Sequence, residues 1–276
     1  MSKRCDITGL SAEDINLFGH LHSQLIGELE LNEVSNESLT GFEKPLQRTV
    51  SNHRLSTGDL KRKESLIKHL EKSITSKFNG SKLTAFGSSE SGLSLKTGDL
   101  DLCLQAAKVD QKKVIKRISG MLRGQGMESV QALTRAKVPI VKFTDPRSGM
   151  HVDISINNTL AIHNTKLLAQ YAKLDERVKQ LAICVKHWAL HRNLSDAPNG
   201  TLSSYGWSVL VIFHLIKEGV IANLQSGEDR TIADIEGKEY DITINDISKS
   251  DSESKASLAE LLYSFFKNYA TFDWTN

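Results

Sequence analysis

Two aspartates lie two residues apart in the segment Thr97–Leu104, which reads TGDLDLCL. Side chains alternate along a β-strand, so Asp99 and Asp101 share one face while the leucines between and after them enter the core. Mg²⁺ or Mn²⁺ prefers carboxylate oxygen, and Mg²⁺ is usually held by one or two carboxylates together with substrate phosphates. The pair predicts a divalent metal site, although two such acids on a surface strand are more often simply solvated.

A third carboxylate follows in the segment HVDISI, residues 151–156. Val152, Ile154 and Ile156 form its core face, which leaves Asp153 on the other face. If this strand pairs beside the first, three acids surround one site. Three acids suit a two-metal phosphoryl transfer, in which ions about 3.5–4 Å apart stabilise the attacking and leaving oxygens. The alternative is that all three aspartates are structural.

Between these acids and the N-terminus, a strand ending at Phe86 is broken by Gly87 and Ser88. Backbone N–H groups and a hydroxyl in such a turn can hold a triphosphate. A Gly-Ser pair alone is more often an ordinary turn, so its value depends on its position ten residues before the acidic strand.

Helical periodicity brackets these strands. Helices are predicted over 12–32 and 59–77, separated by a polar stretch that contains a loop, and another over 111–123. Short strands are predicted over 83–86, 100–104, 138–143 and 152–156. After residue 158 the chain is predicted to be helical, with apolar stripes over 178–189, 203–216 and 257–270 and a solvated loop over 246–257.

Composition sets outer limits. The 276 residues are 39% hydrophobic with a net charge of +2, which fits a globular protein of two parts and gives no overall charge argument for a polyanionic partner. Locally, residues 44–82 hold ten basic and three acidic residues, a net of +7 that could touch phosphates or be a solvated helix face. Three scattered cysteines suggest neither a zinc cluster nor disulfides.

No apolar run is long enough to span a bilayer, and the first residues lack the apolar stretch of a secretory signal. The sequence therefore reads as intracellular, with the cytoplasm favoured over the mitochondrion.

The order of motifs resembles the DNA polymerase beta nucleotidyltransferase superfamily: an apolar residue, Gly87-Ser88, ten residues, the acidic strand and then Asp153. The following words resemble terminal uridylyltransferases and poly(A)-polymerase-like enzymes. They are Asn158, His163-Asn164-Thr165, Tyr171, Val185-Lys186-His187-Trp188 and Gly200-Thr201-Leu202-Ser203-Ser204-Tyr205-Gly206. The resemblance covers about residues 84–216.

This resemblance implies an α+β, bilobal fold with a small mixed-sheet palm domain and an all-helical central domain. The implied divisions are 1–55 for N-terminal helices packing with the helical domain, 56–158 for the catalytic domain and 159–276 for the helical domain. The nucleotide would bind in the cleft between the lobes.

The resemblance also implies roles for individual residues. Asp99 and Asp101 would bind both metals, and Asp153 would help hold the ion that activates an RNA 3′-hydroxyl and accept its proton. The implied nucleotide contacts are Gly87, Ser88, Lys186 and Ser204 at the triphosphate, Tyr205 stacking on the base, Asn158 at the ribose and base, and Asn164 in support. Without the surrounding words, Lys186 would read as an exposed lysine and Tyr205 as a buried aromatic.

The activity implied is template-independent addition of UMP from UTP to an RNA 3′ end, by a monomer or a subunit of an RNA-processing complex. A poly(A)-type enzyme using ATP and an inactive nucleotide- or RNA-binding relative are the alternatives. An oligonucleotide-synthesising signalling enzyme has a similar metal centre, but nothing in the sequence favours it.

Two departures from the family pattern stand out. Leu190 occupies the position of a second basic residue, with Arg192 nearby, and the printed sequence stops at Asn276, before the family segment that returns to the nucleotide. Weaker phosphate binding, or replacement by Arg192, is the expectation from the first. From the second, we expect either a truncated chain or a shortened member that selects its base differently.

Overall fold

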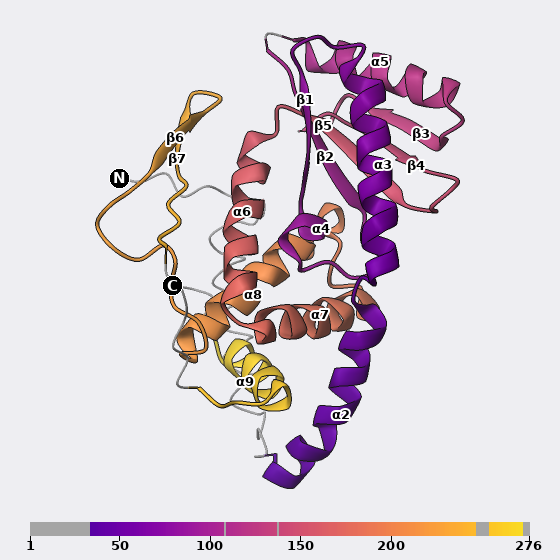
Figure 1. The fold of residues 1–276 in the computed structure, drawn as a ribbon. Helices are drawn as coiled ribbons and strands as arrows, with labels where there is room; N and C mark the ends of the chain where they lie inside the picture. The colour runs from indigo at the N-terminus through magenta and orange to yellow at the C-terminus, as the bar shows by residue number, and fades with distance from the viewer. Residues whose placement is uncertain (1–33, 108, 137, 247–253, 273–276) are drawn as a thin grey trace.

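The computed structural model describes residues 34–107, 109–136, 138–246 and 254–272 (Figure 1). The helices are α2 Asn36–His53, α3 Thr57–Thr75, α4 Ser88–Ser91, α5 Gln111–Gly124, α6 Thr159–Leu174, α7 Glu176–His191, α8 Ser204–Lys217 and α9 Leu258–Ala270, with a short 3₁₀ turn η1 at Ala197–Asn199. The strands are β1 Lys82–Phe86, β2 Leu100–Gln105, β3 Glu128–Leu133, β4 Ile140–Thr144, β5 His151–Ile156, β6 Ile232–Ile235 and β7 Lys238–Asp241. The helix predicted over 12–32 lies outside the described residues.

Five strands form one mixed sheet in the order β1-β2-β5-β4-β3. β2 and β5 run parallel, and the other neighbouring pairs are antiparallel. The predicted mixed-sheet lobe beside a helical lobe is confirmed, and the fold is α+β.

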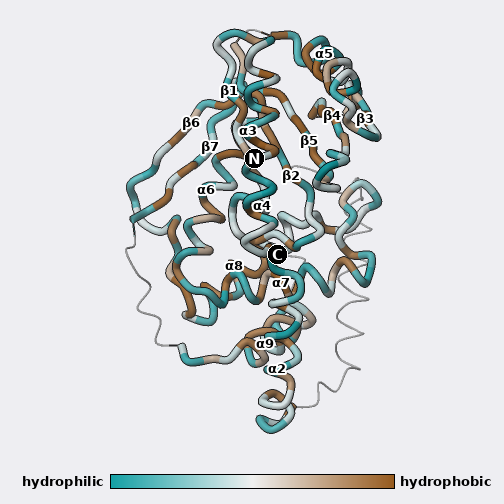
Figure 2. Tube along the Cα trace, turned by 45° about the vertical axis from the view of Figure 1, so that its right-hand side comes forward, coloured by the Kyte–Doolittle hydropathy of each residue, from teal (hydrophilic) through white to brown (hydrophobic). Residues whose placement is uncertain are grey.

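Alternation along the strands places apolar residues in the core of this sheet. Leu102 and Leu104 on β2 and Ile154 on β5 have no exposed surface. On the helices, Leu70 and Ile74 of α3 reach the same core, and α3 packs on β1 while α5 packs on β3, β4 and β5. The hydrophobic segments, brown in Figure 2, follow these strands and α8.

A second core lies among the helices. α7 packs on α2, α6, α8 and α9, and α2 also contacts α9. Leu93 and Leu95, from the loop between α4 and β2, belong to this helical core although they precede the catalytic strand. The chain thus passes from the helical core to the sheet core just before the aspartates. We propose the division 1–55, 56–158 and 159–276, with Leu93 and Leu95 as residues of the second part that pack in the core of the third.

The polar stretch before residue 59 was predicted to contain a loop, and that prediction understates its structure. Residues 36–53 form α2, capped by the Ser35 side chain, and only Leu46 and Val50 in it are buried. A helix with such a narrow apolar contact carries a weak periodic signal. The strand predicted from residue 138 begins at Ile140, because Pro139 cannot donate to the ladder.

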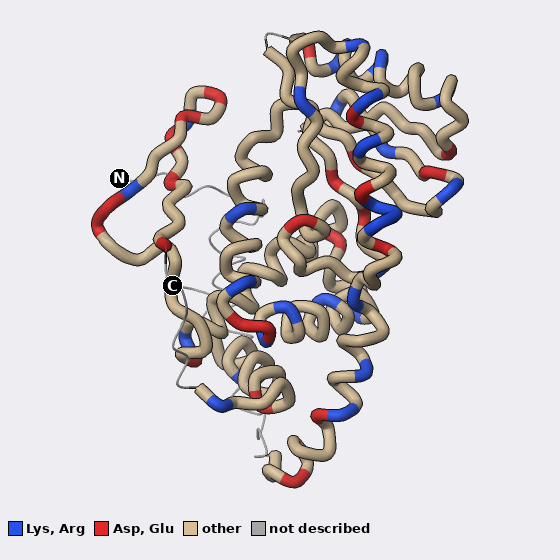
Figure 3. The backbone as a smooth tube through the Cα atoms, in the orientation of Figure 1, with Lys and Arg blue, Asp and Glu red and all other residues tan. Residues whose placement is uncertain are grey.

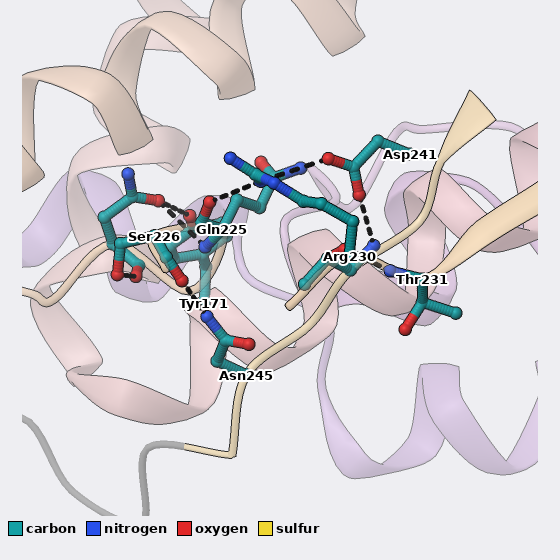
Figure 4. A network of polar contacts seen from close by, with 9 residues as sticks. Tyr171, Gln225, Ser226, Arg230, Thr231, Asp241 and Asn245 are labelled. Atoms are coloured by element: carbon teal, nitrogen blue, oxygen red, sulfur yellow. Dashed lines mark hydrogen bonds and ion pairs between the residues drawn. The ribbon is translucent and has the colours of Figure 1, made fainter. Parts of the chain in front are cut away.

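Elements that the sequence did not predict include β3, α6 as a separate helix, and the β6–β7 hairpin. The hairpin is tied down at its base (Figure 4): Arg230 donates to the Gln225 carbonyl at 2.9 Å and pairs with Asp241 at 3.1 Å. Tyr171 on α6 accepts from the Leu224 N–H at 3.1 Å. The Arg230 contacts hold the base of the hairpin to the segment after α8, and Tyr171 joins that segment to α6. In the described ranges, no helix has both the length and the apolar character that crossing a bilayer would require.

The helical core predicts a large cost for one aromatic truncation. Phe265 is 1% exposed and packs against His214, Phe266 and Tyr269. Replacing it with alanine leaves a cavity, so Phe265→Ala is expected to lower the free energy of unfolding by about 3–5 kcal/mol. Phe213→Ala removes a half-exposed ring and is expected to change it by less than about 1 kcal/mol. Urea denaturation measures both, and equal losses would contradict this packing.

Candidate active site

The three predicted aspartates are brought together by the parallel pair β2 and β5. Asp101 and Asp153 are direct neighbours in its register, and Asp99 lies immediately before β2. The charge of Asp99 acts on both of the other carboxyls, and that of Asp153 acts on Asp101. Three negative groups therefore share one electrostatic environment at this edge of the sheet.

Burial and repulsion make this environment unfavourable for negative charge. Burial, followed by the charges of Asp153 and Asp99, raises the pKa of Asp101 to about 7, against the opposing charges of Lys142 and Lys186. Burial also raises the pKa of Asp153, against a hydrogen bond from Lys142. A cation placed between these carboxyls would relieve both costs.

Lys142 already supplies one cation to the cluster. It sits opposite Asp153 across the β4–β5 pair, and its Nζ lies 2.6 Å from Asp153 Oδ2. Burial works to lower the pKa of Lys142, but Asp153, with Asp99 and Asp101, raises it overall. The sequence prediction missed this residue, although its place between the core residues Val141 and Phe143 already put it on the other face of its strand.

The residues fit a divalent cation chemically, but the site is not a closed cage. Within the described ranges, no group of three or more His, Cys, Asp or Glu side chains is arranged to hold a metal ion by itself. Because Asp153 is paired with Lys142, Asp99 and Asp101 are the carboxylates that face the cavity between the two lobes described below. Two carboxylates completed by substrate phosphates are the usual Mg²⁺ arrangement.

The Gly87-Ser88 turn faces these acids because β1 pairs antiparallel with β2, with Phe86 opposite Asp101. Gly87 has φ of 80°, and a Cβ there would overlap the Asp101 carboxylate. Only glycine allows this approach. Its N–H donates to Thr165 Oγ1 at 2.8 Å, so that N–H is already used by α6 rather than facing a phosphate.

Thr165 is a second contributor that the sequence prediction did not include among the site residues. Besides accepting from Gly87, its hydroxyl donates to the Ala161 carbonyl one turn earlier, at 2.7 Å. This hydrogen-bond chain joins the turn of the sheet lobe to a helix of the other lobe. The sequence feature that could have identified Thr165 is its place in the family motif His163-Asn164-Thr165.

Two adjoining cavities of 260 and 300 Å³ lie between the lobes and share Ser88, Asp101 and Ser204. The smaller also contains Gly87, Asn164, Thr165 and Tyr205, and the larger contains Asp99, Lys186 and Leu190. Together they form a continuous set of walls, which we call the nucleotide cleft. Eight of the predicted site residues line it.

Lys186 is buried and Tyr205 is partly exposed, the reverse of what each residue would suggest without the family motifs around it. Lys186 is 4% exposed and donates to the Leu93 carbonyl at 2.6 Å. Burial lowers its pKa to about 8, opposed by Asp101. Tyr205 lies in the first turn of α8 and is 46% exposed. The cleft thus has a buried cation at one end and an available aromatic face at the other.

Two predicted residues do not line the cleft cavities. Asp153 lies beside Asp101 but outside their walls, and Asn158 caps α6 without a side-chain hydrogen bond to it. The neighbouring Asn157 instead makes two hydrogen bonds to the backbone of Ala106, at 2.9 Å each. Leu190 lines the larger cavity and Arg192 does not, so the structure offers no replacement by Arg192 there.

Comparison with known proteins identifies the family to which this site belongs. The family model described as the central palm domain of mitochondrial-like poly(A) RNA polymerases matches residues 42–173. A crystal structure of the Cid1 poly(U) polymerase matches with a TM-score of 0.75 and 33% identity, covering 86% of this chain and 74% of that one. The chain belongs to the Cid1-like nucleotidyltransferases of the DNA polymerase beta superfamily.

The relatives of this chain include enzymes named for two different added nucleotides. Terminal uridylyltransferase cid1 of Schizosaccharomyces pombe is 37% identical over 228 residues, which cover 79% of this chain and 56% of the relative. Poly(A) RNA polymerase GLD2 of Mus musculus is 35% identical over 240 residues, covering 78% and 48%. The chain spans about half the length of these two relatives.

The raised pKa of Asp101 predicts a pH-dependent stability cost in this nucleotidyltransferase. Between pH 3.8, the ordinary pKa of the group, and about pH 7, its raised pKa, the folded state holds a proton on Asp101 that the unfolded state has lost. Stability contributed by this proton is complete below pH 3.8 and is lost as pH rises through 7, by up to about 4 kcal/mol. Asp101→Asn is therefore expected to gain stability over the wild type between pH 4 and pH 8.

Urea denaturation at both pH values in a chelator measures this difference. Asp229→Asn, at an exposed position in the loop before the hairpin, is the matched control and is expected to show no such gain. A difference between Asp101→Asn and wild type that does not change with pH would refute the assignment. Added Mg²⁺ at pH 8 is expected to stabilise the wild type and not Asp101→Asn.

Proposed function

We propose that this protein transfers nucleotides from a nucleoside triphosphate to the 3′ end of RNA without a template, releasing pyrophosphate. The observation that carries the proposal is the meeting of Asp99 and Asp101 with the Gly87-Ser88 turn at the floor of the nucleotide cleft. Membership of a family whose named relatives are RNA nucleotide-adding enzymes supports it.

Each residue has a physical role in the proposed reaction. Asp99 and Asp101 hold divalent cations, which when bound would neutralise charge on the reacting phosphates. Ser88, Lys186 and Ser204 bind the triphosphate from the walls that they share. Their contacts would hold the β- and γ-phosphates as the pyrophosphate leaving group.

Bond formation and proton transfer are assigned to the opposite side of the acids. The RNA 3′-oxygen attacks the α-phosphorus as the bond from that phosphorus to pyrophosphate breaks. Asp153 accepts the 3′-hydroxyl proton, a role suited to a carboxyl whose pKa is raised by burial. The Lys142 ammonium, whose Nζ lies 2.6 Å from Asp153 Oδ2, favours the ionised carboxylate that this step needs.

UTP is the proposed nucleotide and ATP is the alternative. Structures of Cid1 with the UTP analogue UMPNPP and with the short product ApU match this chain with TM-scores of 0.74 and 0.75. GLD2 enzymes align over a similar share of the chain, which keeps ATP as a specific second candidate. In both cases Tyr205 stacks on the base and Asn164 supports its position, and Asn158, the N-cap of α6, contacts the ribose and base.

The proposed cofactor is Mg²⁺, or Mn²⁺ in its place, and the proposed partners are the triphosphate and an RNA 3′ end. Mg²⁺-bound Cid1 structures are among the similar ones. The cytoplasm is the proposed compartment, because a similar structure, at 34% identity, is of a cytoplasmic RNA terminal U-transferase.

Extension of a short labelled RNA with Mg²⁺ and each nucleoside triphosphate separately tests the activity. Lengthening is expected with UTP, while lengthening with ATP alone would replace the uridylyl assignment. Asp99→Ala with Asp101→Ala is expected to abolish extension because the metal-binding carboxylates are gone. Asp229→Asn, also the loss of one aspartate, is expected to extend normally. Failure of the wild type with all four nucleotides, with RNA binding intact, would favour the inactive binding relative.

The stacking role of Tyr205 gives a separate prediction. Removing an aromatic face costs about 1–3 kcal/mol per stacked base, so Tyr205→Ala is expected to raise the KM for the nucleotide by about tenfold or more. Tyr205→Phe keeps the face and is expected to stay within about threefold of the wild type. Steady-state kinetics at saturating RNA separates the two; equal KM values for the alanine and phenylalanine variants would exclude stacking.

A further inference from the structure

A third cavity, of 430 Å³, adjoins the nucleotide cleft along the segment Thr97-Gly98-Asp99. These three residues line both spaces, so the segment forms a partition with Asp99 at its end. The remaining walls come from α3, from α4 and the loop after it, and from the turn between β4 and β5. Its walls include Asp59, Arg62, Lys63, Ser89 and Lys96. We call this space the partition cavity.

Basic side chains reach the partition cavity from two elements. Arg62 and Lys63 come from α3, within the basic stretch that the sequence singled out, and Lys96 comes from the partition loop. Figure 3 shows Lys and Arg, in blue, along α2 and α3. Part of the basic stretch 44–82 therefore lines the partition cavity, whereas none of these three residues lines the nucleotide cleft.

The three cations differ in how firmly they are engaged. Lys63 is mostly buried, pairs with Glu90 at 2.8 Å and donates to the Ser89 carbonyl at 2.8 Å. Arg62 is more than half exposed and pairs with Asp59 at 2.5 Å. Lys96 is exposed, and among the described residues its ammonium has no ion-pair partner. Its charge helps to lower the pKa of Asp59, but because no ion pair holds the Lys96 ammonium, it can also contact an anion in the cavity.

An unpartnered hydroxyl provides an independent sign of a ligand. Ser89 is 9% exposed and lines the partition cavity, yet its Oγ is buried without a hydrogen-bond partner. Within the described ranges, Asp145 Oδ1 is the one other buried side-chain oxygen or nitrogen in this state. A buried hydroxyl without a partner costs free energy, which an acceptor in the cavity would recover if the Ser89 side chain turned toward it.

We propose that the partition cavity binds the last phosphodiester of the RNA being extended, with Lys96, Arg62 and Ser89 as its contacts. The inference rests on the proposed function and deepens it, because it names residues that position the RNA 3′ end. A phosphate held there places the terminal ribose beside Asp99, on the side away from the nucleotide.

The arrangement separates two anionic ligands by one acidic wall. The nucleotide phosphates are assigned to Lys186 in the cleft, and the RNA phosphate to Lys96 in the partition cavity. Asp59 and Asp99 also line the partition cavity, so an anion fits only near the basic side formed by α3 and Lys96. Repulsion from the Asp59 and Asp99 carboxylates would keep the RNA phosphate on that basic side.

Lys96→Ala tests the assignment in the full-length chain. The KM for a short RNA is expected to rise about tenfold, as for loss of one charged hydrogen bond, with kcat and the KM for the nucleotide unchanged. The slope of log affinity against log salt, from fluorescence anisotropy, is expected to fall by about 0.7. Lys61→Ala removes an exposed lysine of α3 that does not line the cavity, and its RNA KM is expected to stay at the wild-type value.

A chemically altered RNA identifies the phosphate. Replacing the last phosphodiester by a neutral methylphosphonate is expected to weaken binding to the wild type by the same factor, and to have no further effect on Lys96→Ala. The same replacement at an internal linkage is expected to leave the effect of Lys96→Ala intact. Ser89→Ala is expected to weaken RNA binding while leaving the melting temperature unchanged or raised, since it deletes an unpartnered hydroxyl.

The outcomes separate failure of the inference from failure of the proposed function. RNA extension by the wild type with an unchanged RNA KM in Lys96→Ala overturns the cavity assignment alone. An equal rise in Lys61→Ala, or additive effects of Lys96→Ala and the terminal methylphosphonate, overturns it as well. A rise in the nucleotide KM instead assigns the cavity to the triphosphate. Absence of extension by the wild type overturns the proposed function, and the anisotropy measurements then still decide whether Lys96 binds the terminal phosphate.

Discussion

Repulsion among three neighbouring carboxyls, of which Asp101 and Asp153 are partly buried, is the constraint around which this structure is organised. Asp101 and Asp153 are forced together by a parallel strand register, and Asp99 joins them from the preceding loop. The protein compensates only in part: Lys142 pairs with Asp153, and Lys186 acts on Asp101 from the helical lobe. Incomplete compensation is what a cation-binding site requires, because a fully neutralised cluster would have little affinity for an added ion.

The same constraint explains the close backbone approach at residue 87. The turn after β1 must come near Asp101 if a triphosphate is to span the turn and the metal-binding acids. Glycine supplies both the positive φ and the missing Cβ that this approach needs. The hydrogen bond from its N–H to Thr165 then holds the turn against α6, so the position of the turn depends on both lobes.

Sequence reasoning reached the parts of the fold that carry strong local signals. Alternating leucines around Asp99 and Asp101 determined a strand and its polar face, and the apolar stripes of α7, α8 and α9 marked the helical lobe. It failed where few residues are buried, as in α2 and the β6–β7 hairpin, because exposed elements need little apolar periodicity. Lys142 and Thr165 contribute to the site through contacts with residues 11 and 78 positions away, which no local pattern encodes. The placement of Asn158 outside the cleft walls likewise depends on how α6 begins.

Division of the nucleotide cleft between two cores has a consequence for base choice. The acids and Ser88 belong to the sheet lobe, whereas Tyr205 and Asn164 belong to α8 and α6 of the helical lobe. Changes on the helical side can alter which base fits without disturbing the register that brings the carboxyls together. The relatives named for uridylyl and for poly(A) addition have nearly equal identity to this chain, 37% and 35%, as expected if base choice varies on the helical side. The Gly87–Thr165 and Lys186–Leu93 hydrogen bonds each join a backbone group of one part to a side chain of the helical lobe, so they hold the helical side of the cleft against the acids whichever base is bound.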